Sequence, residues 1–102
     1  MASRLKLHEE LCSILGTRYV YFQSPGKSGM VYPCIKYSHS GVNTTRANDK
    51  IYNAVNRYEL TVIDQNPDSE IYKKILEHFS RCSYDSGYIA DNLNHDVLTL
   101  YY

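Results

Sequence analysis

The fold of this chain is decided by residues 57–70, which read Arg57-Tyr58-Glu59-Leu60-Thr61-Val62-Ile63-Asp64-Gln65-Asn66-Pro67-Asp68-Ser69-Glu70. Apolar residues occupy every second position from Tyr58 to Val62, and charged or hydroxyl residues lie between them. Such alternation predicts a β-strand with one face buried and the other in water. Asn66 and Pro67 then supply a capping side chain and a proline for the first helical position, followed by acidic residues. The segment therefore predicts a strand that leads into a helix.

The rest of the chain predicts one further helix and four further strands. An apolar stripe predicts a helix over residues 3–15, with Ser3 as its cap and Gly16 as its stop. The second helix is expected to end near Arg81. Runs of β-branched and aromatic residues predict strands at 18–23, 30–38, 51–64, 82–90 and 95–102. The order α-β-β-β-α-β-β predicts one α+β domain over 1–102, a two-layer sandwich of two helices on a mostly antiparallel sheet of four or five strands.

Several segments carry more specific expectations. Pro33 has no amide hydrogen, so the 30–38 strand should lie at an edge or be bulged there. Residues 39–50 are polar throughout and predict a long loop, which reaches a neighbour and becomes ordered on assembly. A turn or bulge is expected at Ser86-Gly87. The final strand has apolar residues on both faces, so a helix covers one face and a second helix or a neighbouring subunit covers the other.

Composition limits the classes of function. Eleven Lys and Arg balance eleven Asp and Glu, so the chain as a whole has no attraction for nucleic acid or an anionic membrane. No apolar window is long enough for a membrane span, and no secretory stretch opens the sequence. The three cysteines, Cys12, Cys34 and Cys82, predict buried free thiols rather than a disulfide framework. Eleven tyrosines indicate a protein that buries part of its surface against other chains, in interfaces that retain some water.

Motifs that could carry chemistry are weak. His8 with Cys12, and His78 with Cys82, have a spacing that could present two metal ligands, but no CxxC or HExxH motif accompanies them. We expect packed thiols and surface imidazoles. The acids around His95 could serve a metal-dependent nuclease, although the run Asp91-Asn92-Leu93-Asn94 fits a tight turn better. The sequence has no G-x-S-x-G elbow and no P-loop. It therefore predicts no enzyme, no catalytic residue, no metal and no cofactor.

Basic residues concentrate in the middle third of the chain: Lys36, Arg46, Lys50 and Arg57. In a ring of several copies, loops that face inward would form a positive collar able to meet DNA phosphate. The alternative is an ordinary solvated loop, since Asp49 and Glu59 lie among these cations.

The last third of the chain resembles a family of small tail-region proteins of tailed bacteriophages and prophages. The resemblance rests on residues 58–70, on Tyr84-Asp85, and on residues 88–102 with their Ala90-Asp91-Asn92-Leu93-Asn94-His95 run. Residues 30–35 and the N-terminal helix also fit, so it extends over nearly the whole chain. The order of elements is similar to that of tail terminator, or tail completion, proteins. These are small α+β subunits that form hexameric rings.

The resemblance implies a structural role in the virion tail or neck, for a protein made in the cytoplasm of the bacterial host. A hexameric ring would cap the tail tube and join the tail to the head. Its partners would be further copies of the chain, the tail tube protein and a head–tail connector or stopper protein. DNA would pass through the lumen without sequence-specific binding, and no membrane would be involved. The expected assembly residues are Arg46, Asn48, Asp49, Lys50, Tyr88, Tyr101 and Tyr102.

Three alternatives remain at this point. The first is another head–tail connector protein, such as an adaptor or stopper. The second is a small metal-dependent nuclease that uses Asp91, His95 and Asp96. The third is a cytosolic regulator that binds a host protein through its tyrosine surface.

Overall fold

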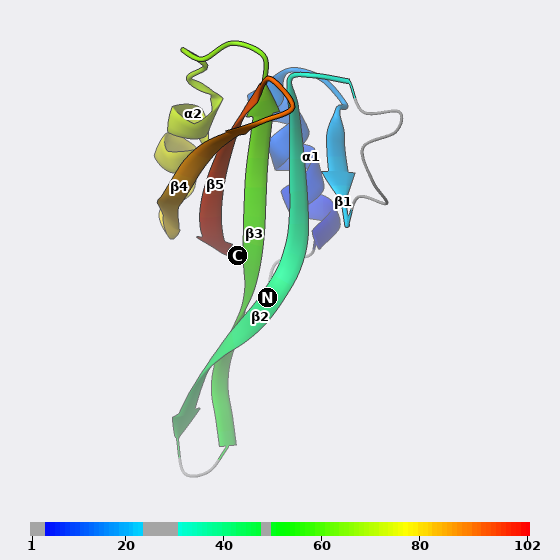
Figure 1. Cartoon of the computed structure of the whole chain (residues 1–102). Helices are drawn as coiled ribbons and strands as arrows, with labels where there is room; N and C mark the ends of the chain where they lie inside the picture. The colour runs from blue at the N-terminus through cyan, green and yellow to red at the C-terminus, as the bar shows by residue number, and fades with distance from the viewer. Residues whose placement is uncertain (1–3, 24–30, 48–49) are drawn as a thin grey trace.

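The computed structural model describes residues 4–23, 31–47 and 50–102, with the backbone alone over 43–47 and 50–54. Two helices and five strands follow one another in the predicted order (Figure 1). They are α1 (Arg4–Leu15), β1 (Val20–Phe22), β2 (Cys34–Ala47), β3 (Lys50–Asp64), α2 (Ile71–His78), β4 (Cys82–Ala90) and β5 (Leu93–Tyr101). The α+β prediction is confirmed.

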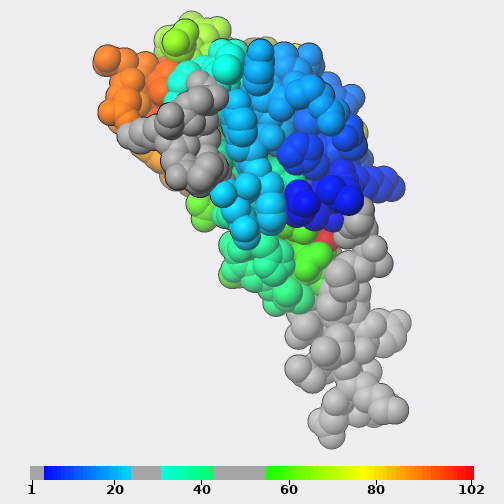
Figure 2. Space-filling model, turned by 90° about the vertical axis from the view of Figure 1, so that its right-hand side faces the viewer, coloured from blue at the N-terminus to red at the C-terminus, as the bar shows by residue number. Residues whose placement is uncertain are grey.

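The five strands form one sheet in the order β1-β2-β3-β5-β4. Only β1 and β2 are parallel, and every other neighbouring pair is antiparallel. The core lies between one face of this sheet and the two helices. Figure 1 looks onto the other face, with α1 behind β2 and β3. Figure 2 shows α1 and β1 side by side on the adjoining side of the body.

The predicted alternation in β3 places its apolar residues in the core. Leu60 pairs with Tyr37 of β2 on one side and with Leu98 of β5 on the other. This row of three side chains is at most 1% exposed. The helices cover the row with Leu11 of α1 and Ile75 of α2, both fully buried. The sequence pattern therefore corresponds to the layer that holds the domain together.

The predicted loop over 39–50 is wrong. β2 continues to Ala47 and β3 begins at Lys50, and the two strands pair from Cys34↔Ile63 to Ala47↔Lys50. Threonine and valine in this polar stretch suit a strand, because β-branched side chains fit a pleated backbone. A polar composition therefore did not indicate a loop here.

Other boundaries also differ from the predictions. Pro33 precedes β2 instead of interrupting it, and β2 lies inside the sheet rather than at its edge. The second helix begins at Ile71, with Glu70 at its cap position and no side-chain cap. The Asn66 side chain instead accepts a hydrogen bond from the Asp68 amide at 3.0 Å, because asparagine can close a local turn before a helix begins. The expected cap Ser3 lies outside the described residues.

The turn between β4 and β5 is the one that the sequence predicts. Ala90 pairs with Leu93, so only Asp91 and Asn92 connect the strands. Both have positive φ angles, 53° and 61°. Two-residue hairpin turns of this kind favour Asp and Asn, which tolerate the left-handed conformation. The expected irregularity near Ser86 is also present, as a register shift between Tyr84 and Ser86.

Candidate assembly surfaces

The most prominent candidate surface is a two-stranded arm formed by the far ends of β2 and β3. The pairing of β1 with β2 ends at Tyr37, and the pairing of β5 with β3 ends at Arg57. The carbonyl oxygen of Asn56 still accepts from the Tyr102 amide at 2.9 Å. From Asn43↔Val55 to Ala47↔Lys50, the two strands pair only with each other in the described part of the chain. The molecule consequently measures 51 × 22 × 22 Å, and the arm leaves the body at the lower end of Figure 1. We call residues 43–47 and 50–55 the arm.

Among the described residues, no third strand pairs with either edge of the arm. An isolated two-stranded hairpin is marginally stable in water. An unpaired edge is also a template for strand addition by another chain. The arm therefore has the chemical features of a segment that contacts a partner.

Arg57 fixes the root of the arm. Its Nη2 donates to the Ser40 carbonyl oxygen at 2.9 Å and its Nε to Ser40 Oγ at 3.2 Å, while Ser40 Oγ donates to the Arg57 carbonyl oxygen at 3.1 Å. Gly41 lies beneath the guanidinium, where a Cβ would stand 2.7 Å from Nη2. The register of β2 and β3 shifts between His39 and Gly41 at the same place. This clamp connects β2 and β3 at the place where the arm leaves the body.

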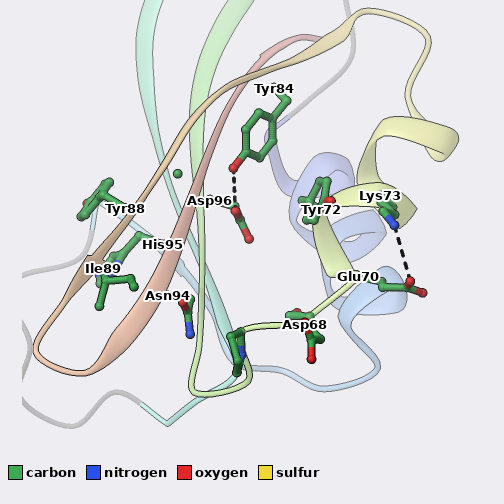
Figure 3. A pocket seen from close by; sticks show the side chains of 13 residues that line it. Asp68, Glu70, Tyr72, Lys73, Tyr84, Tyr88, Ile89, Asn94, His95 and Asp96 are labelled. Carbon is green, nitrogen blue, oxygen red and sulfur yellow. Dashed lines mark hydrogen bonds and ion pairs between the residues drawn. The ribbon is translucent and has the colours of Figure 1, made fainter.

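A groove lies between the segment before α2 and the hairpin of β4 and β5 (Figure 3). Its volume is about 620 Å³. Tyr84 Oη donates to Asp96 Oδ1 at 2.8 Å, and the ring of Tyr72 lies 5.2 Å from that of Tyr84. The hydrogen bond to Asp96 raises the pKa of Tyr84. A Cβ on Gly87 would stand 2.4 Å from Tyr84 Oη, so any larger residue there would have to displace the end of the Tyr84 side chain.

We call the space between these elements the groove, and it is lined by Pro67, Asp68, Ser69, Glu70, Tyr72, Lys73, Tyr84, Gly87, Tyr88, Ile89, Asn94, His95 and Asp96. Apolar side chains on its rim are exposed, with Tyr88 at 51% and Ile89 at 76% of their accessible surface. Tyr88 stacks flat on His95, with ring centroids 4.6 Å apart. The groove thus combines carboxylates, phenols and exposed apolar area.

The predicted assembly residues fall into three places. Tyr88 lies on the groove. The backbones of Arg46 and Lys50 lie in the last paired positions of the arm, beside Asn48 and Asp49, which lie outside the described residues. Tyr101 lies at the end of β5 beneath the Arg81 guanidinium, whose Cζ is 5.3 Å from the ring centroid.

Tyr102 is engaged within the subunit. Its hydroxyl donates to Glu10 Oε2, and its ring packs edge-on against Phe79 with centroids 5.9 Å apart. This contact connects the C-terminal end of the sheet to α1 and α2, so part of the predicted Tyr cluster stabilises the monomer.

The motifs with metal-like spacing have other partners. His8 Nδ1 lies 2.8 Å from Tyr37 Oη, and His78 Nε2 lies 3.2 Å from Glu10 Oε1. Cys12 and Cys34 are buried free thiols, as predicted, whereas Cys82 is half-buried. Burial raises the pKa of Cys34 and of Cys82 to about 11, so both are protonated thiols at neutral pH.

The residues named for nuclease chemistry have different partners, although His95 and Asp96 both line the groove. Asp96 accepts the Tyr84 hydroxyl and His95 stacks on Tyr88, and adjacent residues of a strand point to opposite faces. Asp91 lies in the turn. No group of three or more His, Cys, Asp or Glu that could hold a metal ion occurs among the described residues. Within the same residues, none of the helices has the length and hydrophobicity to cross a bilayer.

The arm, the Arg57 clamp and the Gly87 contact are absent from the sequence-based prediction. One signal for the arm was present, because Thr44, Thr45, Ile51 and Val55 are β-branched and Asn48-Asp49 is a common turn pair. The clamp and the glycine contact depend on which residues meet across the sheet. These contacts depend on the strand register, which the sequence pattern did not determine.

The chain matches no protein-family model, and the searches of curated proteins and of solved structures found no similar protein.

Proposed function

We propose that this protein is a structural subunit of a bacteriophage tail, a tail terminator that forms a ring on the end of the tail tube. The observation that carries the proposal is the arm, a β-ribbon that projects from a small α+β body and pairs with no further strand in the described part of its own chain. Such an element would let each copy of a ring reach the next. The resemblance of residues 58–70 and 88–102 to phage tail-region proteins supports the same role.

The mechanism of this function is assembly. Copies associate head to tail, and the rotation closes the ring, since a heterologous interface forms a closed ring or an open filament. The proposed ring contains six copies. One side docks on the last ring of tail tube protein and stops its polymerisation, and the other side meets the head connector. DNA passes through the lumen without base-specific contacts.

The surface properties suit this role. Eleven cations and eleven anions leave no net charge, so like subunits approach without long-range repulsion. Tyr84, Tyr88 and Ile89 expose large apolar area on one hairpin. Aromatic side chains of this kind are enriched in protein interfaces.

Deletion of the gene in a phage that carries it tests the proposal. Electron microscopy of the deletion lysate should show tails of uncontrolled length, or heads and tails that remain unjoined. Complementation with the full-length gene should restore normal particles. A variant in which an Asn-Gly turn joins Val42 to Asn56 should fail to complement, because it retains the body and lacks the arm.

Intact, infectious virions from the deletion would contradict the proposal. Particles in which the chain lies next to the portal, and away from the tube, would instead assign it to the adaptor or stopper class.

A further inference from the structure

The arm and the groove lie at opposite ends of the molecule. In Figure 1 the arm leaves the body at the bottom, whereas α2 and the β4–β5 hairpin lie in the upper half. Figure 2 places the β4–β5 hairpin, in orange, at the upper end of the body, far from the end where β2 and β3 emerge. One copy therefore offers a projecting element at one end and a hollow surface at the other.

The two ends carry opposite charge. The lining of the groove holds three acids, Asp68, Glu70 and Asp96, and one cation, Lys73, which pairs with Glu70 at 3.5 Å, so its formal charge is negative. Residues 42–57, the arm and its root, contain Arg46, Lys50 and Arg57 against the single acid Asp49. The chain as a whole is neutral. The charge needed to match the acidic end is therefore present at the other end of the same chain.

The surface beside the groove is also suited to a β-ribbon. β4 is the last strand of the sheet in the described residues, so its outer edge has backbone groups available for strand addition. Tyr88 and Ile89 of this strand are half or more exposed. The edges of the arm pair with no third strand in the described part of the chain, so β4 could take them up.

From these observations we infer that the arm of one copy docks into the groove of the next copy, against α2 and β4. The contact is heterologous, because a basic arm meets an acidic groove, and it repeats from copy to copy. This inference rests on the proposed ring and identifies which two surfaces form it. Complementary charge also suppresses like-to-like contacts between two arms or two grooves.

A charge-exchange experiment on the full chain tests the inference. In the first variant, Arg46→Glu and Lys50→Glu make the arm acidic. In the second, Asp68→Lys and Glu70→Lys make the groove basic. Each variant alone would bring like charges together, so sedimentation velocity at low salt should show self-association weakened about tenfold or more. An equimolar mixture should regain the assembly of the wild type, because every arm then meets a groove of opposite charge.

Matched controls separate docking from a general effect of charge. Lys74→Glu and Glu77→Lys change exposed residues on α2 outside the groove lining, and each should leave association within about twofold of wild type. Thermal unfolding identifies any variant that fails to fold. For the groove, Asp68→Asn with Glu70→Gln then serves as a milder second variant, and association should weaken in the same direction.

The outcomes distinguish the inference from the function. Arm-to-groove docking is overturned if either charge-reversed variant associates as strongly as the wild type, or if the mixture does not restore association. The gene deletion still tests the tail role in that case. A wild-type chain that remains monomeric at millimolar concentration also overturns the docking. Normal virions from the gene deletion contradict the tail role, whatever the association data show.

Discussion

Glu10 connects three elements through its carboxylate. Tyr102 donates to Oε2 from the end of β5, and His78 Nε2 lies 3.2 Å from Oε1 at the end of α2. The hydrogen bond from Tyr102 is the main cause of a lowered pKa at Glu10. Burial, followed by the same hydrogen bond, raises the pKa of Tyr102 to about 12. This residue-scale contact holds the helices to the C-terminal strand.

Tyr102→Phe should reduce the free energy of unfolding at pH 7 by about 0.5–1.5 kcal/mol, the usual contribution of one hydrogen bond. In the wild type the lowered Glu10 pKa adds stability that is present above the ordinary value of 4.5 and is lost as pH falls through the lower folded-state value. The raised Tyr102 pKa adds stability that is present below 10 and is lost as pH rises through about 12. Urea unfolding across pH should show both dependences weakened in the variant. Parallel pH profiles for variant and wild type would contradict this account.

Gly87→Ala should displace the Tyr84 hydroxyl from Asp96, because the new Cβ would stand 2.4 Å from Oη. The pKa of Tyr84, raised chiefly by that hydrogen bond, should then fall toward its ordinary value. NMR titration of ring-labelled tyrosine measures this change, and Tyr84→Phe identifies the resonance. Ser86→Ala, at a neighbouring exposed position of the same strand, is the control and should leave the titration unchanged. An unshifted Tyr84 titration in the Gly87 variant would show that the glycine is dispensable for the contact.

At the scale of elements, the two faces of β5 differ in burial. Leu98 and Leu100 are fully buried beneath the helices, while Val97, Thr99 and Tyr101 on the opposite face are partly exposed. The predicted second cover of this strand is thus only partial within one subunit. The β5 face that bears Tyr101 is a surface with room for a neighbour.

Leu98→Ala should reduce the free energy of unfolding by about 2–5 kcal/mol, because it leaves a cavity between Leu60 and the helices. Val97→Ala, one residue earlier on the half-exposed face, should cost about 1 kcal/mol. Chemical denaturation of both variants provides the comparison. Equal losses would contradict the assignment of the core to one face of the sheet.

The sequence predicts the elements whose pattern has a buried face, and it fails where that face is missing. The alternation in 58–62 requires a core, so the strand, its partners and the two-layer fold follow from it. Residues 39–47 show no such alternation, and their polar composition is equally typical of a loop. The groove could not be predicted, because Tyr84, Gly87 and Asp96 meet only after a register shift in β4. Asp91 and Asn92 could be predicted, because a tight turn depends on local backbone preference alone.

At the scale of the whole molecule, the body and the arm have separate tasks. The core includes residues of both helices and of β1, β2, β3 and β5, and its strand members reach no further along β2 and β3 than Tyr37 and Tyr58. The arm lies beyond the end of that core. Folding is therefore a property of the body, and we assign assembly to the arm and the groove.

Removal of the arm should leave the body folded. With Val42 and Asn56 joined by Asn-Gly, a two-residue turn closes the same pair of strands, as favoured for hairpins. Calorimetry should give a Tm within about 5 °C of the full-length monomer, because no core residue is lost. A shift of more than about 15 °C, or loss of cooperative unfolding, would show that the arm belongs to the folding unit.

The most direct test of the central claim is a cryo-electron microscopy map of the assembled particle. We predict a closed ring of this fold between the last ring of tail tube and the head connector, with the arm of each copy in the groove of its neighbour. A map of intact virions in which this chain occupies no position at the end of the tail would contradict the account.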